Sequence, residues 1–182
     1  VGSEMCIRDS DTSTLSYVGN FSISSKDSLP WGVSFNNDGT KMFVSGDSSN
    51  GIHEYNLSTA FTVSSASFDS TFSLSSQDSQ PAGHAFNNDG TKLFVVGRNG
   101  NDVSEYTLST GFDISTASYV DSFSVSSQET DPRNIEFNLD GTKMFLIGSS
   151  SESINEYDLS TGFDVSTATY HGAASIGENA GI

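Results

Sequence analysis

Three glutamates recur at a fixed spacing and are the first candidates for chemistry. Each stands in a Glu-Tyr pair, 51 residues after the one before, at Glu54, Glu105 and Glu156. One carboxylate from each repeat could form a ring. The expected hairpin register instead places a lysine diagonally across from each glutamate: Lys41, Lys92 and Lys143. Because opposite charges at such positions stabilise a sheet, structural pairs are favoured over a ring.

His84 is the candidate base or ligand that breaks the repeat, since Val33 and Ile135 hold the equivalent positions. It could point into a central channel or between two packed sheets. No second His or Cys recurs at metal-binding spacing, so we expect a structural histidine, no metal site and no cofactor. His53 and His171 each occur once and are expected at the surface.

Other motifs for catalysis or cation binding are weak or missing. The repeated Asn-x-Asp-Gly turn faintly resembles a calcium loop, but it lacks the spaced acidic ligands and final glutamate of an EF-hand, so turn formation explains it. No GxSxG, HExxH or Walker sequence is present. Near-identical repeats also disfavour an active site, which needs different residues on different repeats. We therefore expect no enzyme, with no catalytic residues.

Composition excludes some partners. The 182 residues carry 7 Lys+Arg and 23 Asp+Glu, a formal charge of −16, with 34% hydrophobic and 11% aromatic residues. The aromatic content predicts a folded chain, and the acidity argues against nucleic acid. No apolar run is long enough for a membrane helix, so no membrane insertion is expected.

The chain repeats every 51 residues. SFNNDGTKMFVSG begins at Ser34, AFNNDGTKLFVVG at Ala85 and EFNLDGTKMFLIG at Glu136. We divide the chain into repeats 30–80, 81–131 and 132–182, preceded by residues 13–25, which match the last strand of a further repeat. Residues 11–182 are thus one repeat array.

Each repeat predicts four short strands. In the first repeat these are 32–35, 41–45, about 52–57 and 68–75, with an Asn-Asn-Asp-Gly turn between the first two. The second strand is apolar on both faces, and the fourth alternates apolar and polar residues. Such units predict an all-β, partial β-propeller: about three four-stranded antiparallel blades plus an extra N-terminal strand, in an open arc. A parallel β-helix is the less favoured alternative.

Residues 1–10, VGSEMCIRDS, share nothing with the repeats and contain the single cysteine, Cys6. They resemble a translated transposon-type sequencing adapter, so we treat them as a non-native segment. The resemblance implies a metagenomic fragment of a longer protein, whose missing blades would be partners of these.

The repeats differ most on one face of the expected propeller. The connections between the second and third strands, and between the fourth strand and the next repeat, vary, whereas the other two hardly change. We expect this face to bind a protein or glycan ligand. The candidate contacts are Trp31, Arg98, Asp102 and Arg133. Unrestrained drift of loop sequences is an equal alternative.

The segments DGTKMFVSG and IHEYNLST and their copies resemble YVTN-type propeller repeats. The full pattern, through LSTxF, is similar to tandem repeats of uncharacterised marine bacterial and phage proteins. The resemblance covers about residues 12–170 and implies a propeller. We expect a non-enzymatic scaffold or recognition module, extracellular or virion-associated. The alternative is a propeller hydrolase of the lactonase kind, with catalytic residues in missing blades.

Overall fold

The computed structural model describes residues 16–175. The adapter-like segment 1–10 lies outside the described residues, as do residues 13–15 of the expected N-terminal strand and residues 176–182 of the third repeat. Within residues 16–175, no helix is long and apolar enough to cross a membrane.

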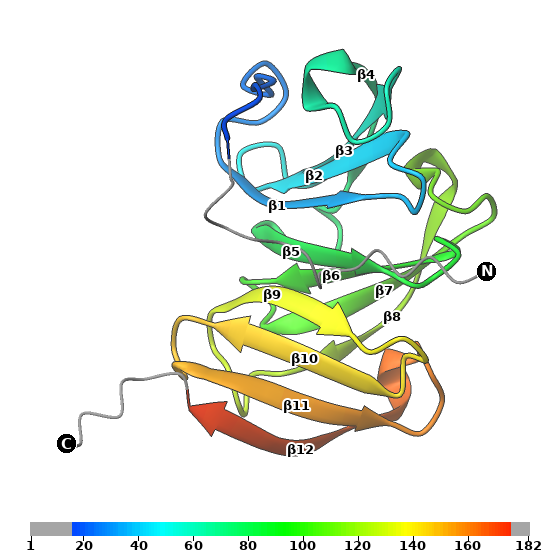
Figure 1. The fold of residues 1–182 in the computed structure, drawn as a ribbon. Helices are drawn as coiled ribbons and strands as arrows, with labels where there is room; N and C mark the ends of the chain where they lie inside the picture. The colour runs from blue at the N-terminus through cyan, green and yellow to red at the C-terminus, as the bar shows by residue number, and fades with distance from the viewer. Residues whose placement is uncertain (1–15, 176–182) are drawn as a thin grey trace.

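The described chain forms three four-stranded antiparallel sheets, one for each repeat (Figure 1). We call them blades 1, 2 and 3. Blade 1 contains β1 (Pro30–Phe35), β2 (Lys41–Gly46), β3 (Gly51–Leu57) and β4 (Ala66–Ser73). Blade 2 contains β5 (Pro81–Phe86), β6 (Lys92–Gly97), β7 (Asp102–Leu108) and β8 (Ala117–Ser124). Blade 3 contains β9 (Pro132–Phe137), β10 (Lys143–Gly148), β11 (Ser153–Leu159) and β12 (Ala168–Ser175).

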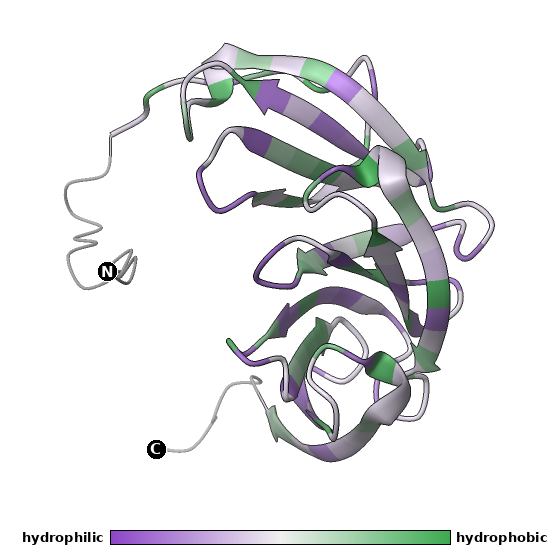
Figure 2. Cartoon of the chain, turned by 90° about the vertical axis from the view of Figure 1, so that its right-hand side faces the viewer, coloured by the Kyte–Doolittle hydropathy of each residue, from purple (hydrophilic) through white to green (hydrophobic). Residues whose placement is uncertain are grey.

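The predicted strands and all-β class are confirmed. The strands of each blade pair in sequence order, and a 3₁₀ turn precedes the fourth strand: η3 (Val63–Ser65), η4 (Ile114–Thr116) and η5 (Val165–Thr167). Figure 2 shows the three sheets set in an open arc. The first strands of neighbouring blades, β1, β5 and β9, lie next to each other and form the inner side of the arc.

The Asp-Gly turn between the first two strands of each blade is fixed by its own side chains. In blade 2, Asn87 Oδ1 accepts the backbone N–H of Lys92 at 2.9 Å, and Asp89 Oδ1 accepts that of Thr91 at 3.0 Å. Gly90 has a φ of +72°, and a Cβ there would lie 2.3 Å from the Phe112 ring. The turn therefore uses its carboxylate and amide oxygens internally and requires glycine.

The apolar cores lie between blades. One core joins Phe43 and Ile52 of blade 1 to Leu93 and Tyr106 of blade 2, and an equivalent core joins blades 2 and 3. The middle strands are buried on both faces, as their continuous apolar sequence predicts. Each blade is thus stabilised chiefly by its neighbours.

Residues 16–23, the N-terminal segment, pack against blade 1 as the last strand of a preceding blade would. They do not form the hydrogen bonds of a strand. Phe21 packs edge-on against Tyr55, with ring centroids 5.5 Å apart, as Phe72 does against Tyr106 at 5.4 Å. Residues 16–23 nevertheless form no strand, because no partner strand lies beside them in the described residues.

Candidate functional site

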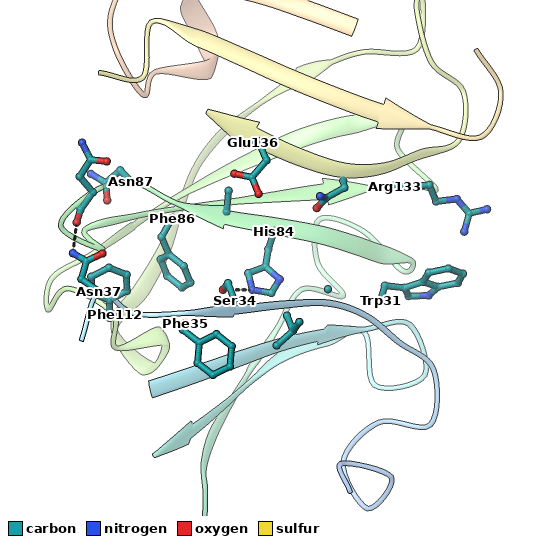
Figure 3. Close-up of a pocket in the computed structure, with 15 residues that line it drawn as sticks. Trp31, Ser34, Phe35, Asn37, His84, Phe86, Asn87, Phe112, Arg133 and Glu136 are labelled. Carbon is teal, nitrogen blue, oxygen red and sulfur yellow. Dashed lines mark hydrogen bonds between the residues drawn. The ribbon is translucent and has the colours of Figure 1, made fainter. Parts of the chain in front are cut away.

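A groove of about 670 Å³ runs along the inner side of the arc, over β1, β5 and β9 (Figure 3). At one end it is lined by Trp31 and Arg133, and at the other by Asn37, Asn87 and Phe112 (Figure 3). Figure 3 shows Ser34, His84 and Glu136 along its middle, each from a different blade. The inner strands therefore bring side chains from all three repeats into one cavity.

The groove is lined both by residues that repeat, such as Phe35 and Phe86, and by residues in which the repeats differ. The inner strands read PWGVSF, PAGHAF and PRNIEF, so each begins with proline, ends with phenylalanine and varies at the four positions between. The middle strands and the turns stay nearly constant. A site with one polar group from each blade is thus compatible with a repetitive sequence.

His84 is held as a neutral imidazole by two serines. The Ser45 hydroxyl donates to the carbonyl of Ala82, so it accepts from His84 Nδ1–H at 3.0 Å. His84 Nε2 is then the acceptor for the Ser34 hydroxyl, at 2.8 Å. Burial lowers the pKa of His84 to about 4. The predicted structural role agrees with these contacts, although the residue also lines the groove.

Glu136 is the carboxylate of the groove. It extends from β9 toward the cavity (Figure 3), and its side chain is exposed there. Partial desolvation by the groove wall raises the pKa of its carboxyl above the usual value. A carboxylate with a raised pKa is a better proton acceptor than an ordinary glutamate. Sequence comparison of the loops alone missed this residue; its signal is that Ser34 and Ala85 hold the equivalent positions.

Three of the four predicted ligand contacts lie together at one end of the groove. The guanidinium carbons of Arg133 and Arg98 lie 4.8 and 5.3 Å from the centroid of the Trp31 ring. Both arginines also bind Asp131, at 2.6 and 2.9 Å. A hydrogen bond from Ser149, followed by those from the arginines, holds the pKa of Asp131 well below its usual range. Arg98 also lies 3.5 Å from Asp47, so the two arginine charges are compensated by two carboxylates.

Asp102 is not part of this cluster. It lies at the start of β7, half-buried, and one of its carboxylate oxygens has no hydrogen-bond partner within residues 16–175. Burial, followed by the nearby charge of Asp78, raises the pKa of Asp102. The structure thus joins Trp31, Arg98 and Arg133 but leaves Asp102 apart.

The recurring glutamates form ion pairs, as expected. Glu105 binds Lys92 at 2.6 Å, and Glu54 binds Lys41 in the same way.

The expectation that His53 lies at the surface is wrong. Its ring is only 2% exposed, and its nitrogens lie 2.9 and 2.8 Å from the hydroxyls of Ser49 and Thr71. The hydroxyls compensate the polar ring, which allows its burial on β3.

One group of side chains, Glu156, Asp158 and His171, has ligand atoms within 4.8 Å of one another. The ammonium of Lys143 already binds both carboxylates, at 3.0 Å in the case of Asp158. The cluster thus has one lysine cation between two carboxylates, and it is an extension of the Lys–Glu pair of blade 3.

The fold and groove define a partial β-propeller, and solved structures support that class. A protein assigned as a 6-phosphogluconolactonase from Bacteroides uniformis matches with a TM-score of 0.58 and 13% identity, over 79% of this chain and 40% of that one. The periplasmic gluconolactonase of Pseudomonas aeruginosa matches with a TM-score of 0.55 and 17% identity, over 80% and 39%. Hydrazine synthase of Kuenenia stuttgartiensis matches at 0.52 and 21%, over 79% and 36%.

The chain therefore spans about two fifths of the length of these proteins. No protein-family profile matches the sequence, and no curated protein matches it. At these identities, the likeness shows the fold.

The prediction that the chain is not an enzyme is wrong. Three of the similar structures carry lactonase names, and this is the finding that contradicts the expectation. The reason given for the prediction also fails, since the repeats are not identical at the groove: Ser34, His84 and Glu136 each break the pattern. Variation that matters for a site lies on the inner strands as well as in the loops.

The low pKa of His84 predicts a loss of stability in acid. Between about pH 6.5 and 4 the unfolded chain binds a proton at this residue and the folded chain does not, so the free energy of unfolding falls as the pH drops through this window. The contribution is at most about 3 kcal/mol. Urea denaturation at a series of pH values should show a shallower pH dependence in His84→Val, which carries the residue of blade 1. Identical slopes would contradict the burial of a neutral imidazole.

Proposed function

We propose that this chain is part of a lactone-hydrolysing β-propeller and that the inner groove binds an uncharged sugar lactone. The observation that carries the proposal is the convergence of Ser34, His84 and Glu136, three residues that break the repeat, in one groove. The lactonase names of two structures with the same fold supply the reaction class.

Glu136 is the proposed general base. A base works best when its pKa is close to the working pH, and partial desolvation in the groove moves the pKa of Glu136 upward toward that range. Burial moves the pKa of His84 downward, to about 4, which makes its imidazole a weak acceptor. His84 is instead suited to hold the Ser34 hydroxyl in place at the groove wall.

Hydrolysis then needs only water and the lactone. Glu136 takes a proton from water as the water oxygen bonds to the lactone carbonyl carbon, and the carbonyl oxygen becomes an oxyanion. The ring C–O bond breaks as the oxyanion reforms the carbonyl, and the leaving ring oxygen takes the proton from Glu136.

The charges of the groove favour an uncharged substrate over a phosphorylated one. The chain carries a net charge of −16, and both arginines near the groove are paired with Asp131. A phosphate would have to compete with that carboxylate. Side-chain amides line the groove and suit sugar hydroxyls: Asn37, Asn87, Asn88 and Asn134.

Glucono-1,5-lactone is the probe for this proposal. Ring opening releases a proton, so a pH-stat measures it, and the rate with the protein is compared with the spontaneous rate in the same buffer. We expect saturable acceleration of glucono-1,5-lactone opening and weaker acceleration with its 6-phosphate. A rate equal to the buffer rate at all protein concentrations would overturn the proposal.

A further inference from the structure

The same contacts join blade 1 to blade 2 and blade 2 to blade 3. Lys41 Nζ donates to the carbonyl of Phe112 in the next blade at 2.8 Å, and Glu54 Oε2 accepts the backbone N–H of Ile114 at 3.0 Å. One blade later, Lys92 donates to the carbonyl of Phe163, and Glu105 accepts the N–H of Val165 at 3.0 Å. A Lys–Glu pair of one blade thus binds the 3₁₀ turn of the following blade.

An aromatic contact accompanies each of these joints. The ring of Phe43 lies 4.7 Å from Phe86 and 6.4 Å from Phe112, two residues of the following blade. Phe94 lies 4.5 Å from Phe137 and 6.3 Å from Phe163 in the same arrangement. Both inserted rings, Phe43 and Phe94, are fully buried.

Blade 3 has the Lys–Glu pair and the phenylalanine with which a blade binds the one after it, but within residues 16–175 no further blade packs against them. Its Glu156 side chain is 30% exposed, compared with 0% for Glu54 and 3% for Glu105. Its Ile154 is 38% exposed, whereas the equivalent Ile52 is fully buried. A cavity of about 400 Å³ lies over this surface, lined by Phe145, Ile154 and Glu156 among others.

Blade 1 has the other side of the joint, namely the turn and the two phenylalanine rings that receive a preceding blade. Its Phe35 and Phe61 rings lie 5.7 Å apart, close to the 5.3 Å between Phe86 and Phe112, which receive Phe43. Phe61 is 47% exposed and Val33 is 63% exposed. The two ends of the array are therefore complementary to each other, in shape and in hydrogen-bonding groups.

We propose that blade 3 of one copy binds blade 1 of a second copy, and that two such contacts close a pair of chains into a ring of blades. Phe145 would enter the Phe35–Phe61 pair, and Lys143 with Glu156 would bind the turn of Phe61 and Val63. Two arcs of three blades fall within the usual range of about 4–8 blades. The joint does not depend on hydrolysis in the groove.

The sequence also favours a second copy as the occupant. In the internal joints a phenylalanine of the fourth strand fills the next blade, but blade 3 has Ala174 at that position. Blade 1 already has the missing ring, since Phe21 packs on Tyr55. Residues 16–20 before it are exposed and form no strand, so they do not repeat the path of β12.

Light scattering after size-exclusion chromatography tests the pair. We expect the wild-type chain at about twice 19.3 kDa, and Phe145→Asp and Phe61→Asp each as monomers. An equimolar mixture of the two variants should regain dimers, because one of the two contacts then has both native rings. Val120→Asp is the matched control: it places the residue of blade 1, Asp69, on an exposed site of blade 2 and should stay dimeric.

Three outcomes would overturn the proposal. A monomeric wild-type chain would show that the ends do not bind, and growth into longer chains would show that the pair does not close. Dimers that persist in both aspartate variants, with circular dichroism showing intact sheets, would place the contact elsewhere.

Discussion

Replacing Glu136 with glutamine should lower the rate of gluconolactone opening by about 10²–10⁴-fold, because the amide keeps the shape of the side chain but takes no proton from water. The loss should appear in kcat, and the KM should change little, since glutamine still offers a hydrogen-bonding oxygen. The control is Glu152→Gln, which removes an exposed carboxylate of the loop before β11 and should keep the full rate.

The pH dependence of the wild-type rate follows from the same group. Glu136 must be deprotonated to act as a base, and partial desolvation in the groove raises the pKa of its carboxyl. The rate should therefore fall as the pH drops through a value above 4.5, the ordinary value for glutamate. Equal activity of Glu136→Gln and the wild type, with the acid limb unchanged, would remove Glu136 from the mechanism.

The repeat explains why the fold was predictable from sequence. Each blade contains the same short-range features: an Asp-Gly turn, at Gly39, Gly90 and Gly141, and a phenylalanine ring that packs over that glycine. A spacing of 51 residues then places equivalent strands side by side. The pairing of Lys92 with Glu105 lies within one hairpin, so local register was sufficient to predict it.

The groove was not predictable in the same way. Ser34 and His84 are 50 residues apart, so they do not occupy equivalent positions, and their contact depends on how β1 and β5 lie against each other. Arg98 and Asp131 are 33 residues apart, and their ion pair likewise depends on how the loop after β6 lies against the segment before β9. Comparison between repeats finds which positions vary, but only the packing of inner strands shows that Glu136 shares a cavity with His84.

The joint between blades contributes a second large effect. Glu105→Ala should lower the free energy of unfolding by about 3 kcal/mol, because it leaves the buried N–H of Val165 without its acceptor and removes the partner of Lys92. This value is at the lower end of the free-energy cost of breaking a buried ion pair, since the Lys92 side chain is 28% exposed and can turn to water. Urea denaturation followed by circular dichroism measures the change.

Glu156→Ala is the matched comparison, because blade 3 has the same Lys–Glu pair without a following blade inside the chain. Its cost should be about 0–1 kcal/mol, as for an exposed pair. Both substitutions are best made in the Phe145→Asp background, where the proposed second copy cannot cover Glu156. Equal losses at both positions would mean that the carboxylate stabilises its own hairpin. A loss confined to Glu105 would mean that it stabilises the joint between blades, since of these two glutamates Glu105 is the one that binds the 3₁₀ turn of a following blade.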